Sequence, residues 1–175
     1  MNHRSRSWIR RRLRSLAWLE LLNIPLQAVI WFGVVGFPVT AANSVGFALF
    51  TLVLLEGAGY WFAKLRRLAT RCGSLPGARA FAVARRTNVA VLSIGLLFIV
   101  WTVVTDPGAG SWPGLAFGLF AALEHVNYFH VQLMYDTAED FRYLRSRGLR
   151  RAHLARGGGG RAGEIGVAQT PRGAG

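Results

Sequence analysis

Cysteine is almost absent from this sequence, since Cys72 is the only one among 175 residues. A single cysteine excludes an internal disulfide, a thiol pair and a metal centre built from several cysteines. Three catalytic signatures are missing as well: an HExxH motif, a glycine-rich phosphate loop and a nucleophile elbow. These absences count against an enzyme, and we predict no resident cofactor and no metal.

Basic residues are missing from two long stretches, 15–63 and 87–141. All 21 Lys and Arg fall into three blocks, 4–14, 64–86 and 142–172, which leave a net charge of +13 in a chain that is 52% hydrophobic. A nucleic-acid-binding domain instead interleaves basic and aromatic residues on one solvated face, so we predict no nucleic-acid partner. Charge blocks separated by apolar runs are typical of a membrane protein.

Four apolar runs lie between or beside these blocks, at 16–37, 45–63, 87–104 and 114–135. Their lengths are close to the roughly 20 residues that a helix needs to cross a bilayer. We therefore predict an all-α membrane protein, a four-transmembrane-helix bundle. The first run is too long for a signal peptide, whose apolar region has about 7–15 residues, and polar residues interrupt it. A mitochondrial transit peptide shares the Arg/Ser character of residues 1–15, but positive residues retained beside a first membrane span explain that character equally well.

The charge blocks also predict the orientation of the bundle. Because Lys and Arg stay on the cytoplasmic side, we expect both termini inside and two short external loops, 37–44 and 105–113. Trp18 and Trp61 then lie near the inner boundary, and Trp101 and Trp112 near the outer one, where indole rings favour the headgroup region. Twenty Arg against one Lys, with abundant Gly and Ala, indicate a GC-rich bacterial genome and hence the plasma (inner) membrane.

The remaining segments are cytoplasmic in this interpretation. Residues 1–15 form a basic N-terminus, 16–136 the membrane domain, and 137–156 a basic helix that either lies on the anionic inner leaflet or is solvated. The Gly-rich tail 157–175 has too little apolar content to fold, so we predict disorder. The expected partners are the lipid bilayer and anionic lipid at the cytoplasmic face.

An internal similarity links the second and fourth runs. EGAGYWFAKL (56–65) aligns with EHVNYFHVQL (124–133), which pairs Glu56 with Glu124 and Tyr60 with Tyr128. The first and third runs also align, at an offset of 70 rather than 68 residues. A duplicated two-helix hairpin, with a pseudo-two-fold axis along the membrane normal, is one interpretation. Chance matching of Leu-rich runs is the other.

Polar side chains gather in the cytoplasmic halves of the runs. On a helix, Glu124 and Tyr128 share one face, while His125 and His130 point apart and so do not hold one ion together. Gly114, Gly118 and Ala122 form a small-residue stripe suited to a close helix neighbour. The candidate binding residues, which make one pocket if their helices face one another, are Glu20, Asn23, Glu56, Tyr60, Glu124, His125, Asn127 and Tyr128.

Intramembrane polar residues mark an ion path, a ligand site or a structural network. We predict a small non-catalytic bundle whose polar pocket binds a lipid or a partner, either a second copy or another membrane protein. One alternative is a proton- or cation-coupled transporter that uses Glu56 and Glu124. Another is an enzyme acting on a lipid or quinone with His125 or His130 as base. Haem would need axial His ligands, normally from two helices, whereas both intramembrane His lie on one run.

Overall fold

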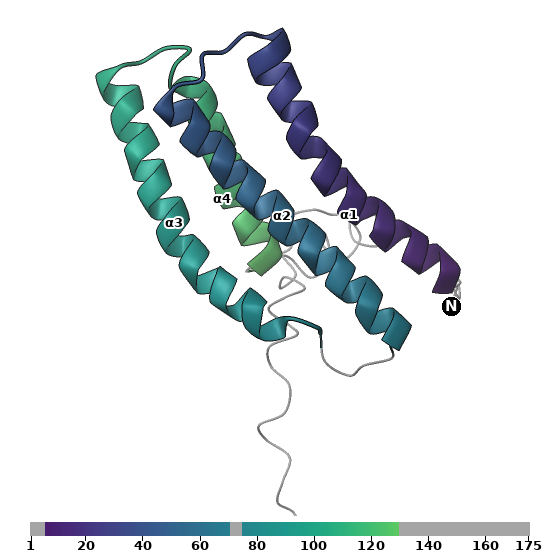
Figure 1. The fold of residues 1–175 in the computed structure, drawn as a ribbon. Coiled ribbons are helices and arrows are strands. Elements are labelled where there is room, and N and C mark those ends of the chain that lie inside the picture. Colours follow the sequence, from purple (N-terminus) through teal and green to yellow (C-terminus); the bar gives the residue numbers. More distant parts are fainter. Residues whose placement is uncertain (1–5, 71–74, 130–175) are drawn as a thin grey trace, which may run out of the picture.

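The computed structural model describes residues 6–70 and 75–129, and this part of the chain is helical apart from short connections. α1 (Arg6–Ala28) continues directly into a π-helical segment, η1 (Val29–Val34), and is followed by α2 (Ala41–Thr70), α3 (Ala78–Thr105) and α4 (Trp112–Phe129). The helices lie side by side in alternating directions, so both short loops, 35–40 and 106–111, are at one end (Figure 1). The predicted cytoplasmic helix 137–156 and tail 157–175 lie outside the described residues.

Three segments are long and apolar enough to cross a membrane: Ser7–Val34, Ala41–Thr70 and Ala78–Thr105, of 28, 30 and 28 residues. At ~1.5 Å per residue each exceeds the ~30 Å hydrocarbon layer. Large apolar side chains cover their outer faces, as Leu97 does with 71% of its surface exposed, which suits contact with lipid. The protein is therefore a membrane-embedded helical bundle. α4 is described over 18 residues and is not among the three, so a fourth crossing stays a prediction.

The helices extend beyond the apolar runs. α1 begins at Arg6, inside the basic segment, while α2 continues to Thr70 and α3 begins at Ala78, inside the basic block 64–86. Arg and Lys are good helix formers, so their charge ends a membrane span without ending the helix. The apolar pattern gives no sign of η1, which lies just after Pro25, a residue that already removes one helical hydrogen bond.

α2 is the central helix and packs against α1, α3 and α4. An aliphatic cluster around Leu49 and Ile99 joins it to α3 and α4. An aromatic cluster around Phe50 and Phe117 joins it to α4 and is covered by residues of α1 and η1. α1 rests mainly on α2, because α1 and α4 approach each other at isolated positions at most.

Glycine permits the closest approach in the bundle, between α2 and α4. A Cβ atom on Gly46 would overlap the carbonyl oxygen of Gly114, and one on Gly114 would overlap the backbone of Ala42. A Cβ atom on Gly118 would lie 2.8 Å from Leu96 of α3. Gly114 and Gly118, two members of the predicted small-residue stripe, thus lie at close helix contacts, as small residues commonly do in membrane bundles.

Asn43 joins the two short loops and the start of α4 by hydrogen bonds at the loop end of the bundle. Its side chain is fully buried, and its amide nitrogen donates hydrogen bonds to the carbonyl oxygens of Pro38 (2.8 Å) and Ala109 (2.9 Å). Its amide oxygen accepts a hydrogen bond from the backbone N–H of Gly114 at 2.8 Å. The first N–H groups of a helix lack partners within it, so Asn43 caps α4 from another helix. One side chain thereby fixes both loops relative to each other.

Candidate intramembrane binding site

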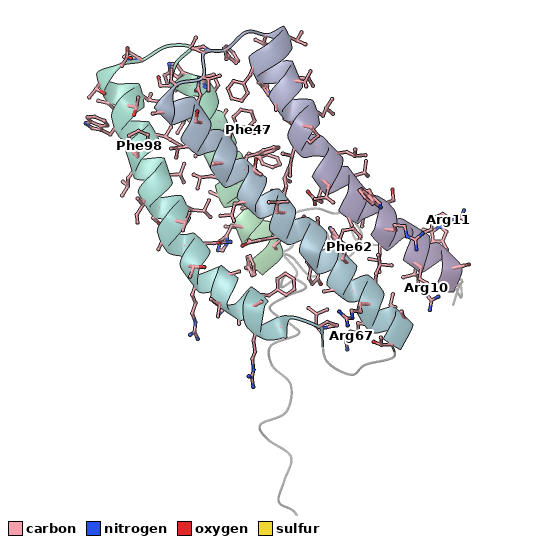
Figure 2. All side chains as sticks on the ribbon, viewed as in Figure 1. Arg10, Arg11, Phe47, Phe62, Arg67 and Phe98 are labelled. Atoms are coloured by element: carbon pink, nitrogen blue, oxygen red, sulfur yellow. The ribbon has the colours of Figure 1, made fainter. Side chains whose placement is uncertain are left out.

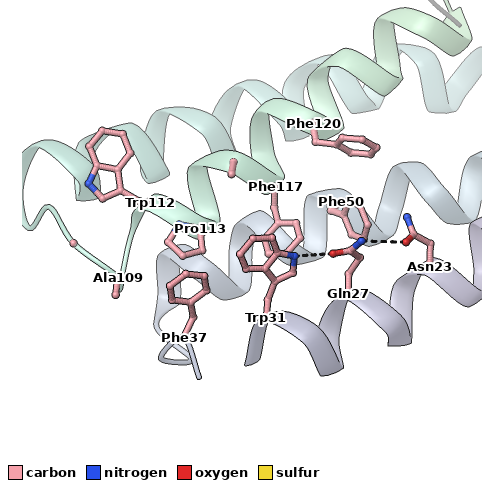
Figure 3. Close-up of a pocket in the computed structure, with 12 residues that line it drawn as sticks. Asn23, Gln27, Trp31, Phe37, Phe50, Ala109, Trp112, Pro113, Phe117 and Phe120 are labelled. Atoms are coloured by element: carbon pink, nitrogen blue, oxygen red, sulfur yellow. Dashed lines mark hydrogen bonds between the residues drawn. The ribbon is translucent and has the colours of Figure 1, made fainter. Parts of the chain in front are cut away.

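A cleft of about 650 Å³ lies between α1 and α4 and extends from the loop 106–111 toward the middle of both helices (Figure 3). Its walls come from α1, η1 and α4, and Phe50 of α2 contributes to its lining. The residues that line it are Asn23, Gln27, Trp31, Phe37, Phe50, Gly108, Ala109, Trp112, Pro113, Ala116, Phe117 and Phe120.

Six of the twelve residues that line the cleft are aromatic, and several of their rings pack against one another. Trp31 stacks on Phe37 with ring centroids 5.5 Å apart and meets Phe117 edge-on at 6.1 Å. Phe50 contacts both Phe117 (5.2 Å) and Phe120 (5.4 Å). Rings held in such pairs give a largely preformed apolar surface. Small-molecule sites typically combine such a surface, in clefts of roughly 300–1,000 Å³, with a few polar groups.

The polar groups of the cleft form a ladder along one face of α1 and η1. The indole N–H of Trp31 donates to the amide oxygen of Gln27 at 2.6 Å, and the amide nitrogen of Gln27 donates to the amide oxygen of Asn23 at 3.2 Å (Figure 3). The three residues follow each other at intervals of four, so they share a helix face. The Asn23 amide nitrogen, whose two N–H donors are not used in this ladder, stands at its inner end.

A second polar group connects α1, α2 and α4. The Tyr128 hydroxyl donates a hydrogen bond to the Glu20 carboxylate, and the Asn127 amide nitrogen donates to Glu124 at 3.2 Å. Tyr128 follows Glu124 by four positions, so Glu124 lies one turn of α4 away from the residue that bonds to Glu20. The indole nitrogen of Trp61 is buried within reach of Glu20 but outside good hydrogen-bond geometry. We call Glu20, Glu124 and Tyr128 the carboxyl cluster.

The carboxyl cluster lies just past the end of the cleft that is farther from the loop 106–111. Glu20 precedes the lining residue Asn23 by three positions, and Glu124 follows the lining residue Phe120 by four. Each step is about one helical turn, or roughly 5 Å along the axis. The two helices that wall the cleft therefore each place a carboxyl group just past it.

Glu56 belongs to a different helix interface. Its carboxylate accepts a hydrogen bond of 2.5 Å from the amide nitrogen of Asn88, which joins α2 to α3. Tyr60, one turn further along α2, is buried, and the Lys64 ammonium lies 5.2 Å from the ring centroids of both Tyr60 and Trp61. The structure thus distributes the predicted polar residues over two interfaces: Glu20, Glu124, Asn127 and Tyr128 on one side, Glu56 on the other.

His125, one of the two histidines of the fourth run, does not line the cleft. His125 is buried in α4, 5% exposed, with its ring centroid 4.9 Å from that of Phe129. His130 lies outside the described residues. Within residues 6–70 and 75–129 there is no group of three or more His, Cys, Asp or Glu side chains that could hold a metal ion. Catalysis by a histidine base in the cleft therefore gains no support from these positions.

Gln27, Trp31, Phe117 and Phe120 line the cleft but are not among the binding residues predicted from the sequence. The spacing of Asn23, Gln27 and Trp31 is a visible signal, because three side chains with hydrogen-bonding groups recur every fourth position of an apolar run. Phe117 and Phe120 carry no such signal, since aromatic residues at helical spacing describe a packed core equally well. Asn88, the partner of Glu56, lies at the edge of an apolar run and gives no sign of which helix it faces.

Comparison of the chain with protein-family models, curated proteins and solved structures finds no match.

Proposed function

We propose that the protein is a non-catalytic, membrane-embedded binding protein that holds a molecule from the lipid phase in the cleft between α1 and α4. The observation that carries this proposal is the cleft itself: about 650 Å³ with aromatic walls and a ladder of amide groups on one side. A void between packed membrane helices loses the contacts of its lining atoms, so an occupant of matching chemistry stabilises it.

The position of the cleft favours a ligand that is dissolved in the bilayer. One wall belongs to Ser7–Val34, a segment long and apolar enough to cross a membrane. Trp112 and Phe120 on the opposite wall are 54% and 39% exposed, so the outer edge of that wall reaches the surrounding medium. An apolar molecule could enter sideways without leaving hydrocarbon, and Asn23 would meet its polar group. Asn23 is half-buried, and an amide that is shielded from water gains from a ligand that completes its hydrogen bonds.

The proposed setting is the plasma membrane of a bacterium, with both termini cytoplasmic and α4 as the fourth crossing. Arg10, Arg11 and Arg67 lie at the end of the bundle opposite the short loops (Figure 2). The first residues of α3 add Arg79, Arg85 and Arg86, all exposed, near the same end. This concentration of positive charge supports the positive-inside orientation and contact with anionic lipid headgroups.

We also propose that the bundle arose by duplication of a helical hairpin. Gly46 and Gly114 correspond to each other at the same offset of 68 residues that pairs Glu56 with Glu124, and they meet where α2 and α4 are closest. The Thr40 hydroxyl donates to the carbonyl oxygen of Gly110, so the corresponding loops also meet. Residues that correspond under a two-fold axis touch only near that axis, which supports the pairing. Under the same two-fold relation, the interface between α2 and α3 corresponds to the interface between α4 and α1. Side chains fill the α2–α3 interface, whereas the α4–α1 interface contains the cleft.

Ion-coupled transport is a second candidate, and the carboxyl cluster favours it. Proton and ion paths through membrane proteins are commonly built from such acids. The neighbour of Glu124 is Glu20 of α1, whereas Glu56 bonds to Asn88 on the far side of α2. A transport mechanism in this protein would therefore use Glu20 with Glu124.

Photolabelling tests the binding proposal. The probe is hexadecanol with a diazirine in its chain, applied to the protein in lipid nanodiscs, with labelled residues mapped by mass spectrometry. We expect saturable labelling of Trp31, Phe37 and Ala116–Phe120, which unlabelled hexadecanol suppresses. Ala116→Trp fills the cleft and should lower this labelling at least tenfold.

The matched control is Ala48→Trp, which adds the same indole to an exposed alanine of α2 that does not line the cleft. It should leave the labelling within about twofold of the unmodified protein. Labelling that rises linearly with probe concentration and covers all outward faces of the bundle equally would show that the cleft binds nothing specifically.

A further inference from the structure

The cleft and the carboxyl cluster form one continuous feature along the seam between α1 and α4. Along α1, the face that carries Trp31, Gln27 and Asn23 continues inward to Glu20. Along α4, the face that carries Phe117 and Phe120 continues inward to Glu124. Both walls therefore change in the same order, from aromatic rings near the loops to a carboxyl group deeper in the helix. The Tyr128–Glu20 hydrogen bond closes this seam at its inner end.

We propose that the ligand of the cleft is an amphipathic organic cation, such as a long-chain amine or quaternary ammonium compound. Its apolar body would lie between the aromatic walls, and its positive end would point toward Glu20 and Glu124. This inference rests on the proposed function, because it names the ligand class of the same cleft.

Charge complementarity selects a cation. Tyr128, which donates a hydrogen bond to Glu20, follows Glu124 by four positions, so α1 and α4 bring two carboxyl groups to the same level of the seam. Like charges side by side in a low-dielectric region repel, and a positive charge near both relieves that repulsion. The same carboxyl groups disfavour a phosphate or carboxylate headgroup at this depth. A neutral ligand would offer these carboxyl groups no positive partner.

The aromatic walls suit the same ligand class. The faces of Trp and Phe rings attract cations, and a desolvated ammonium group gains most from such contact. Trp31 and Phe117 line the cleft between the loops and Asn23, so a cation bound in the cleft lies among aromatic rings. A bare metal ion fits less well, because it needs more oxygen ligands than two carboxyl groups provide.

Two probes of equal length separate the contribution of charge from that of the apolar chain. One is the diazirine-bearing hexadecanol used above, and the other is hexadecyltrimethylammonium with the diazirine at the same carbon. In the unmodified protein, the cationic probe should half-saturate the cleft residues at a concentration about tenfold lower than the alcohol, as expected for one charge interaction of moderate strength. Equal half-saturation concentrations for the two probes would overturn the proposal.

Glu20→Gln and Glu124→Gln test which groups supply the preference. Each variant should weaken labelling by the cationic probe about tenfold and leave the alcohol within twofold. Glu56→Gln is the matched control, because Glu56 lies at the interface between α2 and α3, and it should change neither probe. If the cationic probe keeps its advantage over the alcohol in both Glu20→Gln and Glu124→Gln, these two carboxyl groups are not the source of the preference. Circular dichroism and gel filtration establish that the variants fold, and the comparison in the unmodified protein decides the question if they do not.

The two proposals fail in different ways. If the alcohol saturates the cleft and the cation has no advantage, the protein binds a lipid-phase molecule but not a cation. If neither probe labels the cleft saturably and Ala116→Trp changes nothing, the binding function itself is wrong.

Discussion

The two seams on either side of α2 and α4 differ in how they are packed. On the side of α3, Leu49, Leu92 and Ile99 pack in one cluster, and an added Cβ atom on Gly95 or Gly118 would lie 2.8 Å from a neighbouring Leu side chain. On the side of α1, aromatic rings and amides surround about 650 Å³ of space. Membrane helices associate through close packing of small residues, because lipid chains are as apolar as Leu. The seam beside α3 is therefore closed by side-chain packing, whereas the seam beside α1 leaves room for a ligand; we call them the closed seam and the open seam.

The largest expected effect comes from Gly46, where α2 touches α4. Gly46→Leu would push side-chain atoms into the backbone of Gly114, and we expect a loss of about 3 kcal/mol or more in the free energy of unfolding. Titration with sodium dodecyl sulfate in mixed micelles, followed by circular dichroism, measures this change. Gly59→Leu is the control on the same helix, since a Cβ atom there meets nothing within 4 Å, and equal losses in both variants would refute the close α2–α4 contact.

Substitution of two asparagines compares the stability contributed by the loop end of the bundle with that contributed by the open seam. Asn43→Leu removes three hydrogen bonds and leaves the buried N–H of Gly114 unpaired, so we expect a loss of about 2 kcal/mol in the same titration. Asn23→Leu removes only the end of the ladder in the open seam, and we expect a change within about 0.5 kcal/mol. Similar losses for both variants would mean that the open seam contributes as much to stability as the loop end does.

The smallest expected effect comes from truncating one apolar side chain in each seam and comparing the losses in the free energy of unfolding. Ile99→Ala, at a fully buried position of the closed seam, should lower the free energy of unfolding by about 1 to 2 kcal/mol through lost packing. Phe120→Ala, at a position 39% exposed beside the cleft, should lower it by less than about 1 kcal/mol. If Phe120→Ala is the more damaging substitution, the aromatic wall is a structural core and not a ligand surface.

Much of the architecture could be predicted from the sequence because it depends on composition over long stretches. Blocks of Arg and runs of some 20 apolar residues predict a helical membrane protein, and the structure confirms helices and three segments suited to crossing. Helix ends are less predictable, since Arg6 and Thr70 continue helices beyond the apolar runs. Charge decides where a span ends, whereas helix propensity decides where the helix ends.

The candidate site could be predicted only in part, because it depends on which helix faces which. Intramembrane position marked Glu20, Glu56 and Glu124 as candidates, yet only the fold assigns Glu20 and Glu124 to one seam and Glu56 to another. The role of Asn43 was equally inaccessible, since its partners Ala109 and Gly114 lie more than 60 positions away. A helical pattern identifies faces but does not say what each face meets.

Crystallography with a heavy-atom ligand tests the central claim most directly. The protein would be crystallised from a lipidic mesophase that contains hexadecyltrimethylammonium brominated near the middle of its chain, and the bromine would be located by anomalous diffraction. We predict a bromine peak between Trp31 and Phe117, with α1 and α4 apart as they are here. Bromine confined to the outer surfaces of the bundle, together with α1 packed directly against α4, would contradict the account.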